Sequence, residues 1–117
     1  MASTLFVLND PPYGTERSYN ALRLAVSLAK REGESVQIFL MGDAASCAKA
    51  GQKVPQGHYR IEALLQIASR QGASIAACGT CLEARGIVDG ELIERVTRGT
   101  MEVLTNWTVQ TDRTLVF

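Results

Sequence analysis

The chain has 117 residues, of which 46% are hydrophobic and 21% charged, and its twelve basic side chains balance twelve acidic ones. This length suits a single domain over residues 1–117, and the balanced charge argues against a nucleic-acid partner, which needs a basic face. No apolar stretch approaches the length of a membrane span, and the first ten residues lack the basic start of a signal peptide. We therefore expect a cytoplasmic protein without a membrane partner, whose three cysteines rest reduced.

The N-terminal half alternates expected strands and helices. In chain order it contains a buried strand at 5–8, a loop at 9–14, a helix capped by Thr15 or Ser18 and closed by Lys30 and Arg31, a strand at 36–41, a short helix at 44–50 and a loop at 51–59. The first helix is apolar nearly all round, and Gly33 ends it. The loop at 51–59 lacks periodicity, which indicates a mobile excursion over the strand ends.

The C-terminal half continues the alternation. It contains a helix at 60–71, a strand from Ser74 to Ala77 or Cys78, a tight segment through Gly86, a turn or short helix from Asp89, a brief strand at Val96, a helix at 100–111 and a strand at 114–117. The side chains of the last helix that should face inward are Met101, Val103 or Leu104, and Trp107 or Thr108. Alternating strands and helices predict an α/β fold with a mainly parallel sheet covered on both faces.

The most informative segment is the run IAACGTCLEARGI at 75–87. Its apolar part ends in Cys78, and Cys81 follows after Gly79 and Thr80. In open α/β sheets ligands bind at the carboxyl ends of the strands, so we expect both sulfurs at a functional edge. A cysteine at a helix start meets unpaired N–H groups, which favour the thiolate, and Arg85 acts in the same direction. Such a thiolate can accept sulfane sulfur and hold it as a persulfide.

Other interpretations of the cysteines stay open. Free cysteines often only pack, and core packing is the expected role of Cys47, which lies in an apolar helix. A thioredoxin-like disulfide site has the spacing of Cys78 and Cys81, but it lies at a helix start in a different fold. Zinc needs about four ligands, whereas the chain offers two thiols and His58, its one histidine. We therefore expect no metal and no cofactor.

Three further side chains are candidates for the pocket around the thiols. His58 lies in the loop after the second strand, which can reach the end of the third strand. Tyr13 and Glu16 follow the first strand and so face the same edge of the sheet, although an ordinary turn and a first helical turn explain them equally well. The pair Gly79 and Gly86 forms no phosphate-binding fingerprint.

Three segments in this order resemble the DsrE/DsrF-like family and come closest to its small YchN-like members. They are FVLNDPPYG at 6–14, FLMGDA at 39–44, and CGTC at 78–81 followed by RGI at 85–87. The resemblance runs along essentially the whole chain, from the first strand to the last three residues.

This resemblance implies a three-layer α/β/α sandwich with a mostly parallel five-stranded sheet. It also implies a homo-oligomer, commonly a trimer or a hexamer. Better-understood relatives act in sulfur oxidation and in the sulfur relay for tRNA thiolation, and their active cysteine lies at a strand end before an Arg-Gly or similar pair. Spacing back from Arg85 and Gly86, Cys78 matches that position. Cys81 matches the Cys-x-x-Cys variant of the YchN-like branch, and the relay relatives lack this second cysteine.

We therefore predict a sulfur carrier or sulfurtransferase-like protein, with Cys78 as the acceptor of sulfane sulfur, Cys81 as the second thiol, and sulfur donor and acceptor proteins as partners. In a rival interpretation the protein is a non-catalytic oligomeric module that binds a small ligand, and its cysteines are structural. A dithiol redox switch is a third interpretation. The pKa of the thiols discriminates between a carrier and a module with structural cysteines, because a carrier needs one thiol whose pKa lies well below the free value of about 8.5.

Overall fold

The computed structural model describes all 117 residues and shows five strands in one sheet. The strands lie in the order β4-β3-β2-β1-β5, and every neighbouring pair is parallel. Their bounds are β1 Ala2–Leu8, β2 Glu34–Leu40, β3 Ser74–Cys78, β4 Val96–Gly99 and β5 Arg113–Val116. Parallel neighbours need crossover connections, which is why a helical segment separates each strand from the next. The expected α/β fold with a five-stranded parallel sheet is confirmed.

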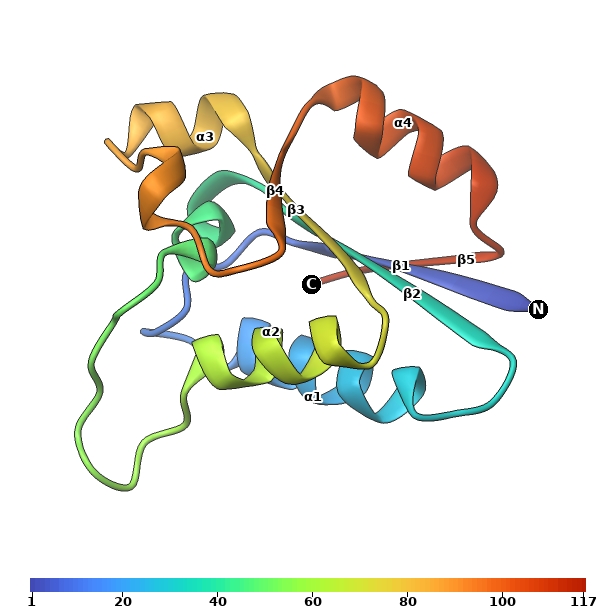
Figure 1. Ribbon diagram of the computed structural model, residues 1–117, viewed down its shortest axis with the longest axis horizontal. Helices are drawn as coiled ribbons and strands as arrows, with labels where there is room; N and C mark the ends of the chain where they lie inside the picture. Colours follow the sequence, from blue (N-terminus) through green and yellow to red (C-terminus); the bar gives the residue numbers. More distant parts are fainter.

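Helices cover both faces of this sheet (Figure 1). The α-helices are α1 Arg17–Ala29, α2 Ile61–Arg70, α3 Gly79–Ala84 and α4 Met101–Gln110, and the short 3₁₀ helices are η1 Gly42–Ala48 and η2 Asp89–Glu91. Helices α1 and α2 lie on one face and α4 lies on the other, while α3 continues directly from the end of β3. None of the helices combines the length and the apolarity that crossing a bilayer requires.

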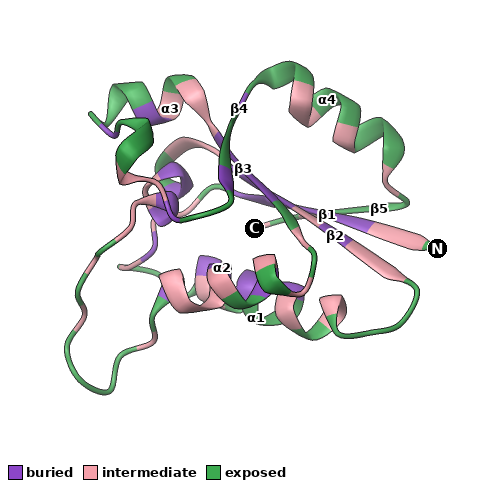
Figure 2. Ribbon diagram, in the orientation of Figure 1, coloured by how far each residue is buried: buried purple, intermediate pink, exposed green.

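The helices on the two faces of the sheet are buried to different degrees, since α1 and α2 contain buried residues and α4 contains none (Figure 2). The side chains on the face under α1 and α2 belong to a cluster of 21 buried residues. In β1 the residues from Thr4 to Leu8 are all buried, which is typical of a strand covered on both sides. The other face has four buried residues, Leu5, Val7, Phe39 and Ala76. Helix α4 covers them without a fully buried residue of its own.

The start of α1 differs from the expected side-chain cap. Its N-cap residue is Glu16, whose side chain makes no capping hydrogen bond. The Thr15 hydroxyl accepts a bond from the N–H of Arg17 at 3.3 Å, and the Ser18 hydroxyl instead donates to the carbonyl of Asp10 at 2.7 Å. Ser18 is therefore not the cap, because its side chain ties the helix to the loop after β1, whereas Thr15 accepts the first N–H of the helix from the position before Glu16.

Helix α4 also differs from expectation at two positions. Leu104 and Trp107 are half-buried against the sheet as predicted. Met101 is 65% exposed, because the first turn of α4 lies beyond the carboxyl ends of the strands, where Met101 lines a pocket. Thr108 is exposed as well, and its hydroxyl donates to the carbonyl of Leu104 at 2.7 Å. The prediction that Met101 and Thr108 face inward is wrong.

Gly99 allows β4 to pack closely at the functional edge. It is the register partner of Cys78 on β3, and a Cβ atom at this position would lie 2.9 Å from Cε2 of Phe39 and 3.1 Å from Cβ of Ala76. A side chain at residue 99 would therefore push β4 and the start of α4 away from Cys78.

Gly99→Ala should destabilise the protein by about 1–3 kcal/mol, the usual cost of overpacking a closed core. The matched control is Gly90→Ala, where a Cβ atom meets nothing within 4 Å and the change should stay within about 0.5 kcal/mol. Urea denaturation of both variants measures the effect. Equal stability of Gly99→Ala and the unmodified protein would contradict this account of the contact with Phe39.

Candidate functional site

Cys78 occupies the junction between β3 and α3. It is the last residue of the strand and also the N-cap of the helix, so no loop separates the two elements. The neighbouring strands β2 and β4 end at Leu40 and Gly99, so the sulfur lies at the carboxyl edge of the sheet. Placement of the thiol at a strand end follows from the apolar run that precedes it in the sequence.

Hydrogen bonds favour the ionised form of Cys78. Its Sγ lies 3.3 Å from the hydroxyl oxygen of Thr80. Burial raises the pKa of this thiol, but hydrogen bonds from the Cys81 thiol, the Thr80 hydroxyl and the backbone N–H groups of Cys81 and Thr80 together lower it below its ordinary value. The thiolate is the nucleophilic form of cysteine. Cys78 is half-buried rather than sealed, so it combines a lowered pKa with access.

Cys81 lies in the first turn of α3 and has different surroundings. The backbone N–H of Gly42, at the start of η1, donates to its Sγ at 3.1 Å. Burial and the hydrogen bond with Cys78 raise the pKa of Cys81, and the Gly42 N–H and the positive charge of Arg85 offset this only in part. The two thiols therefore divide into an acidic one at 78 and a protonated one at 81.

Arg85 lies on the Cys81 side of the pair. Its Nη1 donates to the Cys81 carbonyl at 3.0 Å, and its Nη2 forms an ion pair with Asp43 at 2.5 Å. The positive charge of the guanidinium therefore lowers the pKa of Cys81 rather than that of Cys78. It also ties the end of α3 to η1.

A pocket of about 400 Å³ opens beside Cys78. The residues that line it come from the β3–α3 junction and from the end of β4 with the start of α4: Cys78, Gly79, Thr80, Glu83, Arg98, Gly99, Thr100 and Met101. Its volume falls in the range of about 300–1,000 Å³ typical of small-molecule sites. Two of the predicted pocket residues, Gly79 and Thr80, lie in this wall.

Arg98 is a residue of this wall that the sequence did not reveal. Its Nη2 donates to the carbonyl of Gly79 at 3.2 Å and to Glu83 at 3.1 Å, and its Nη1 donates to Asp89 at 3.2 Å. The side chain thereby ties β4 to α3 and η2. The signal that the sequence offered was the brief strand at Val96. Once this strand is placed beside β3, a basic residue just after Val96 lies at the same sheet edge as Cys78.

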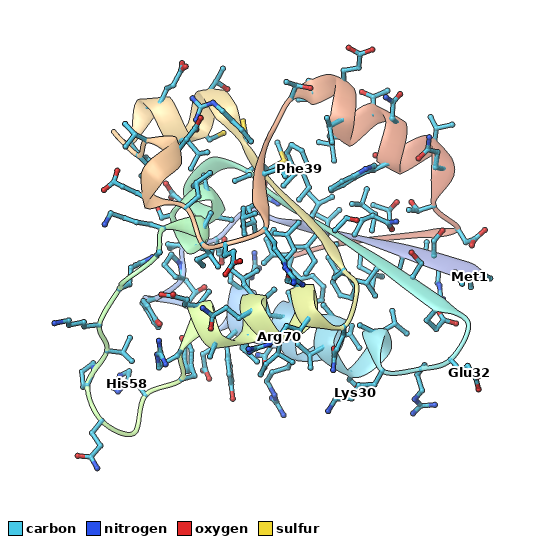
Figure 3. The ribbon with its side chains drawn as sticks, viewed as in Figure 1. Met1, Lys30, Glu32, Phe39, His58 and Arg70 are labelled. Carbon is cyan, nitrogen blue, oxygen red and sulfur yellow. The ribbon has the colours of Figure 1, made fainter.

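The structure does not bring His58, Tyr13 or Glu16 to the pocket beside Cys78. His58 lies on the extended loop before α2 (Figure 3). The hydroxyl of Tyr13 accepts a bond from the N–H of Ile61 at 3.2 Å, and its ring stacks on that of Tyr59 at 5.5 Å. Glu16 is the exposed N-cap of α1. Tyr13 thus fastens the start of α2 to the loop after β1.

Cys47 is buried, as predicted. Its side chain is 1% exposed, its Sγ lies 3.8 Å from the carbonyl oxygen of Asp10, and burial raises its pKa to about 12. This thiol is therefore protonated and enclosed, unlike the pair at the sheet edge. No three His, Cys, Asp or Glu side chains group closely enough to hold a metal ion.

Thr80→Val should move the alkylation of Cys78 to higher pH. The change removes a hydroxyl that stabilises the Cys78 thiolate, so its pKa rises and less thiolate is present at any given pH. Peptide-resolved rates with iodoacetamide across a pH series measure the midpoint. Thr105→Val is the control, because its hydroxyl bonds only to the carbonyl of Met101 within α4. Coincident profiles for the two variants would disprove the contribution of Thr80.

Known proteins resemble this chain over its full length. The model of the DsrE/DsrF-like family matches residues 2–117. Protein YchN of Escherichia coli strain K12 is 38% identical over 118 residues, with 100% of both chains covered, and the crystal structure of that protein matches with a TM-score of 0.94 over 100% of each chain.

A second relative, uncharacterized protein MK0008 of Methanopyrus kandleri, is 41% identical over 111 residues, which are 95% of this chain and 90% of the relative. The structure of MTH1491 from Methanobacterium thermoautotrophicum covers 100% of both chains with a TM-score of 0.76 at 13% identity, and it shows a shared fold alone. The chain therefore belongs to the DsrE/DsrF-like family.

Proposed function

We propose that this protein carries sulfane sulfur as a persulfide on Cys78 and passes it to another thiol. The observation that carries the proposal is the half-buried Cys78 sulfur, whose pKa is lowered by hydrogen bonds at the β3–α3 junction. Membership in a family associated with sulfur relay supports it. A reducing compartment such as the cytoplasm suits the proposal, because both thiols must be free before each cycle.

Loading is a displacement at sulfur without net oxidation. The Cys78 thiolate attacks the outer sulfur of a donor persulfide, the S–S bond of the donor breaks, and the donor thiolate leaves with the electron pair. The product is a persulfide on Cys78. Transfer is the same reaction in reverse, with an acceptor thiolate attacking the outer sulfur and Cys78 leaving as the thiolate.

Cys81 provides a second route of release. As a thiolate it can attack the inner sulfur of the loaded Cys78, which forms the Cys78–Cys81 disulfide and expels the outer sulfur as hydrosulfide. The two thiols are oxidised and the sulfane sulfur is reduced, so a dithiol reductant must then restore the pair. The raised pKa of Cys81 keeps this route slow while direct transfer is available.

Intact mass spectrometry tests loading and release together. After treatment with a low-molecular-weight persulfide, Cys81→Ser should gain the mass of one sulfur atom, which dithiothreitol removes, and Cys78→Ser should gain none. The unmodified protein should show the added sulfur or the internal disulfide with released hydrosulfide. Cys47→Ala is the control and should behave like the unmodified protein, because Cys47 is buried. Sulfur uptake that survives loss of both Cys78 and Cys81 would refute the proposal.

We also propose that the protein acts as a homo-oligomer, either a trimer or a hexamer. Two large apolar side chains are mostly exposed on α4 and the edge strand β5, namely Val109 at 79% and Val116 at 67%. Membership in a family whose members are often oligomeric supports the proposal. Exposed apolar side chains of this kind provide apolar surface for a subunit contact.

Val109→Asp should shift the protein toward smaller species, because it places a charge in the proposed contact. Multi-angle light scattering at micromolar concentration measures the molar mass. Thr105→Asp, on the same helix and also exposed, controls for added charge on α4. A monomeric mass for the unmodified protein would contradict the proposed assembly.

A further inference from the structure

We propose that the pocket beside Cys78 selects its sulfur donor by charge, favouring a persulfide on an uncharged or cationic carrier thiol over a free inorganic anion such as thiosulfate or polysulfide. The inference rests on the proposed persulfide chemistry of Cys78. It adds the chemical class of the molecule that delivers the sulfur.

Carboxylates outnumber guanidinium groups in the ion-pair cluster at the wall of the pocket, because Asp89, which does not line the pocket itself, also binds Arg98. Arg98 is the pocket's one basic lining residue and Glu83 its one acidic lining residue. The guanidinium of Arg98 is bound by Glu83 and also by Asp89, so two carboxylates face one guanidinium. The side chain of Arg98 is 34% exposed, whereas those of Glu83 and Asp89 are 72% and 76% exposed. An approaching molecule therefore meets carboxylate oxygens more than guanidinium.

Several of the other positive groups near the pocket already have partners. The N–H groups of Thr80 and Cys81 stabilise the Cys78 sulfur. The N–H of Val103, at the start of α4, bonds to the Thr100 hydroxyl at 3.2 Å. These bonds reduce the positive potential that is available to an added anion, and a Cys78 thiolate contributes a further negative charge. Like charges slow encounter and opposite charges speed it.

The size and lining of the pocket suit an organic carrier. Its volume of about 400 Å³ greatly exceeds what an anion of a few atoms fills. Gly79 and Gly99 leave the wall beside Cys78 without side chains, and Met101 contributes a flexible thioether that adapts to varied ligands. These features provide room for the carbon atoms next to the donor sulfur.

Charged methanethiosulfonates measure the selectivity directly. The Cys78 thiolate attacks the sulfenyl sulfur of the reagent, a disulfide forms, and methanesulfinate leaves. The full chain carrying Cys81→Ser is treated with the trimethylammonium-ethyl reagent or the sulfonato-ethyl reagent, so that the accessible sulfur is that of Cys78. The rate with the cationic reagent is divided by the rate with the anionic reagent, and this ratio is normalised to the same ratio for a small free thiol. The normalised ratio should be about three or more at low salt and should fall as salt is added.

Two variants and a control show whether the named carboxylates cause the preference. Glu83→Gln and Asp89→Asn should each lower the normalised ratio toward that of the free thiol. Glu94→Gln should leave it unchanged, because Glu94 precedes β4 and so lies at the opposite end of that strand from Gly99. A normalised ratio at or below one, or a ratio that neither Glu83→Gln nor Asp89→Asn lowers, would overturn the inference.

The outcome for donor selection is separable from the outcome for sulfur carriage. Reaction with a methanethiosulfonate needs only an accessible thiolate, so it proceeds whether or not the protein can hold a persulfide. Sulfur uptake on Cys78 without a charge preference refutes the inference and leaves the carrier function standing. A charge preference without sulfur uptake refutes the carrier function, and the inference about the sulfur donor falls with it.

Discussion

The hydrogen bonds that converge on the sulfur of Cys78 are the interaction on which the site depends. They exist because β3 continues into α3 without a loop, so the N–H groups that a first helical turn leaves unpaired are aimed at the last strand residue. The surrounding contacts hold this turn in place. Arg98 binds it from the side of β4, and Gly42 binds it from the side of β2.

The two cysteines gain different properties from this one turn. The Cys81 thiol donates toward Cys78, and this shared hydrogen bond lowers the pKa of Cys78 and raises that of Cys81. A pair of equal thiols would compete for incoming sulfur, whereas an acidic thiol beside a protonated one gives a defined acceptor.

The sequence predicts the sheet and the place of Cys78 because the signals for both are local. Apolar runs bounded by glycine turns identify each strand, and the position of a cysteine at the end of such a run needs no knowledge of distant residues. The contact of Gly42 with Cys81 joins residues 39 apart in the sequence, and the direction of the loop after β1 depends on a bond between Tyr13 and Ile61, which are 48 apart. Pairings of this range leave no local pattern, which is why Tyr13 and His58 could not be placed by sequence alone.

The two thiols lie toward different faces of the sheet, which fits the proposed order in which they act. Cys78 packs against the cluster under α4 and lines the pocket there, whereas Cys81 packs against the larger core on the face of α1 and α2 and does not line that pocket. A donor that enters beside α4 therefore meets Cys78 first. Cys81 then reaches the sulfur from the opposite side, through the junction of β3 and α3. Access and the lowered pKa thus favour the same residue, Cys78, as the acceptor in the proposed transfer.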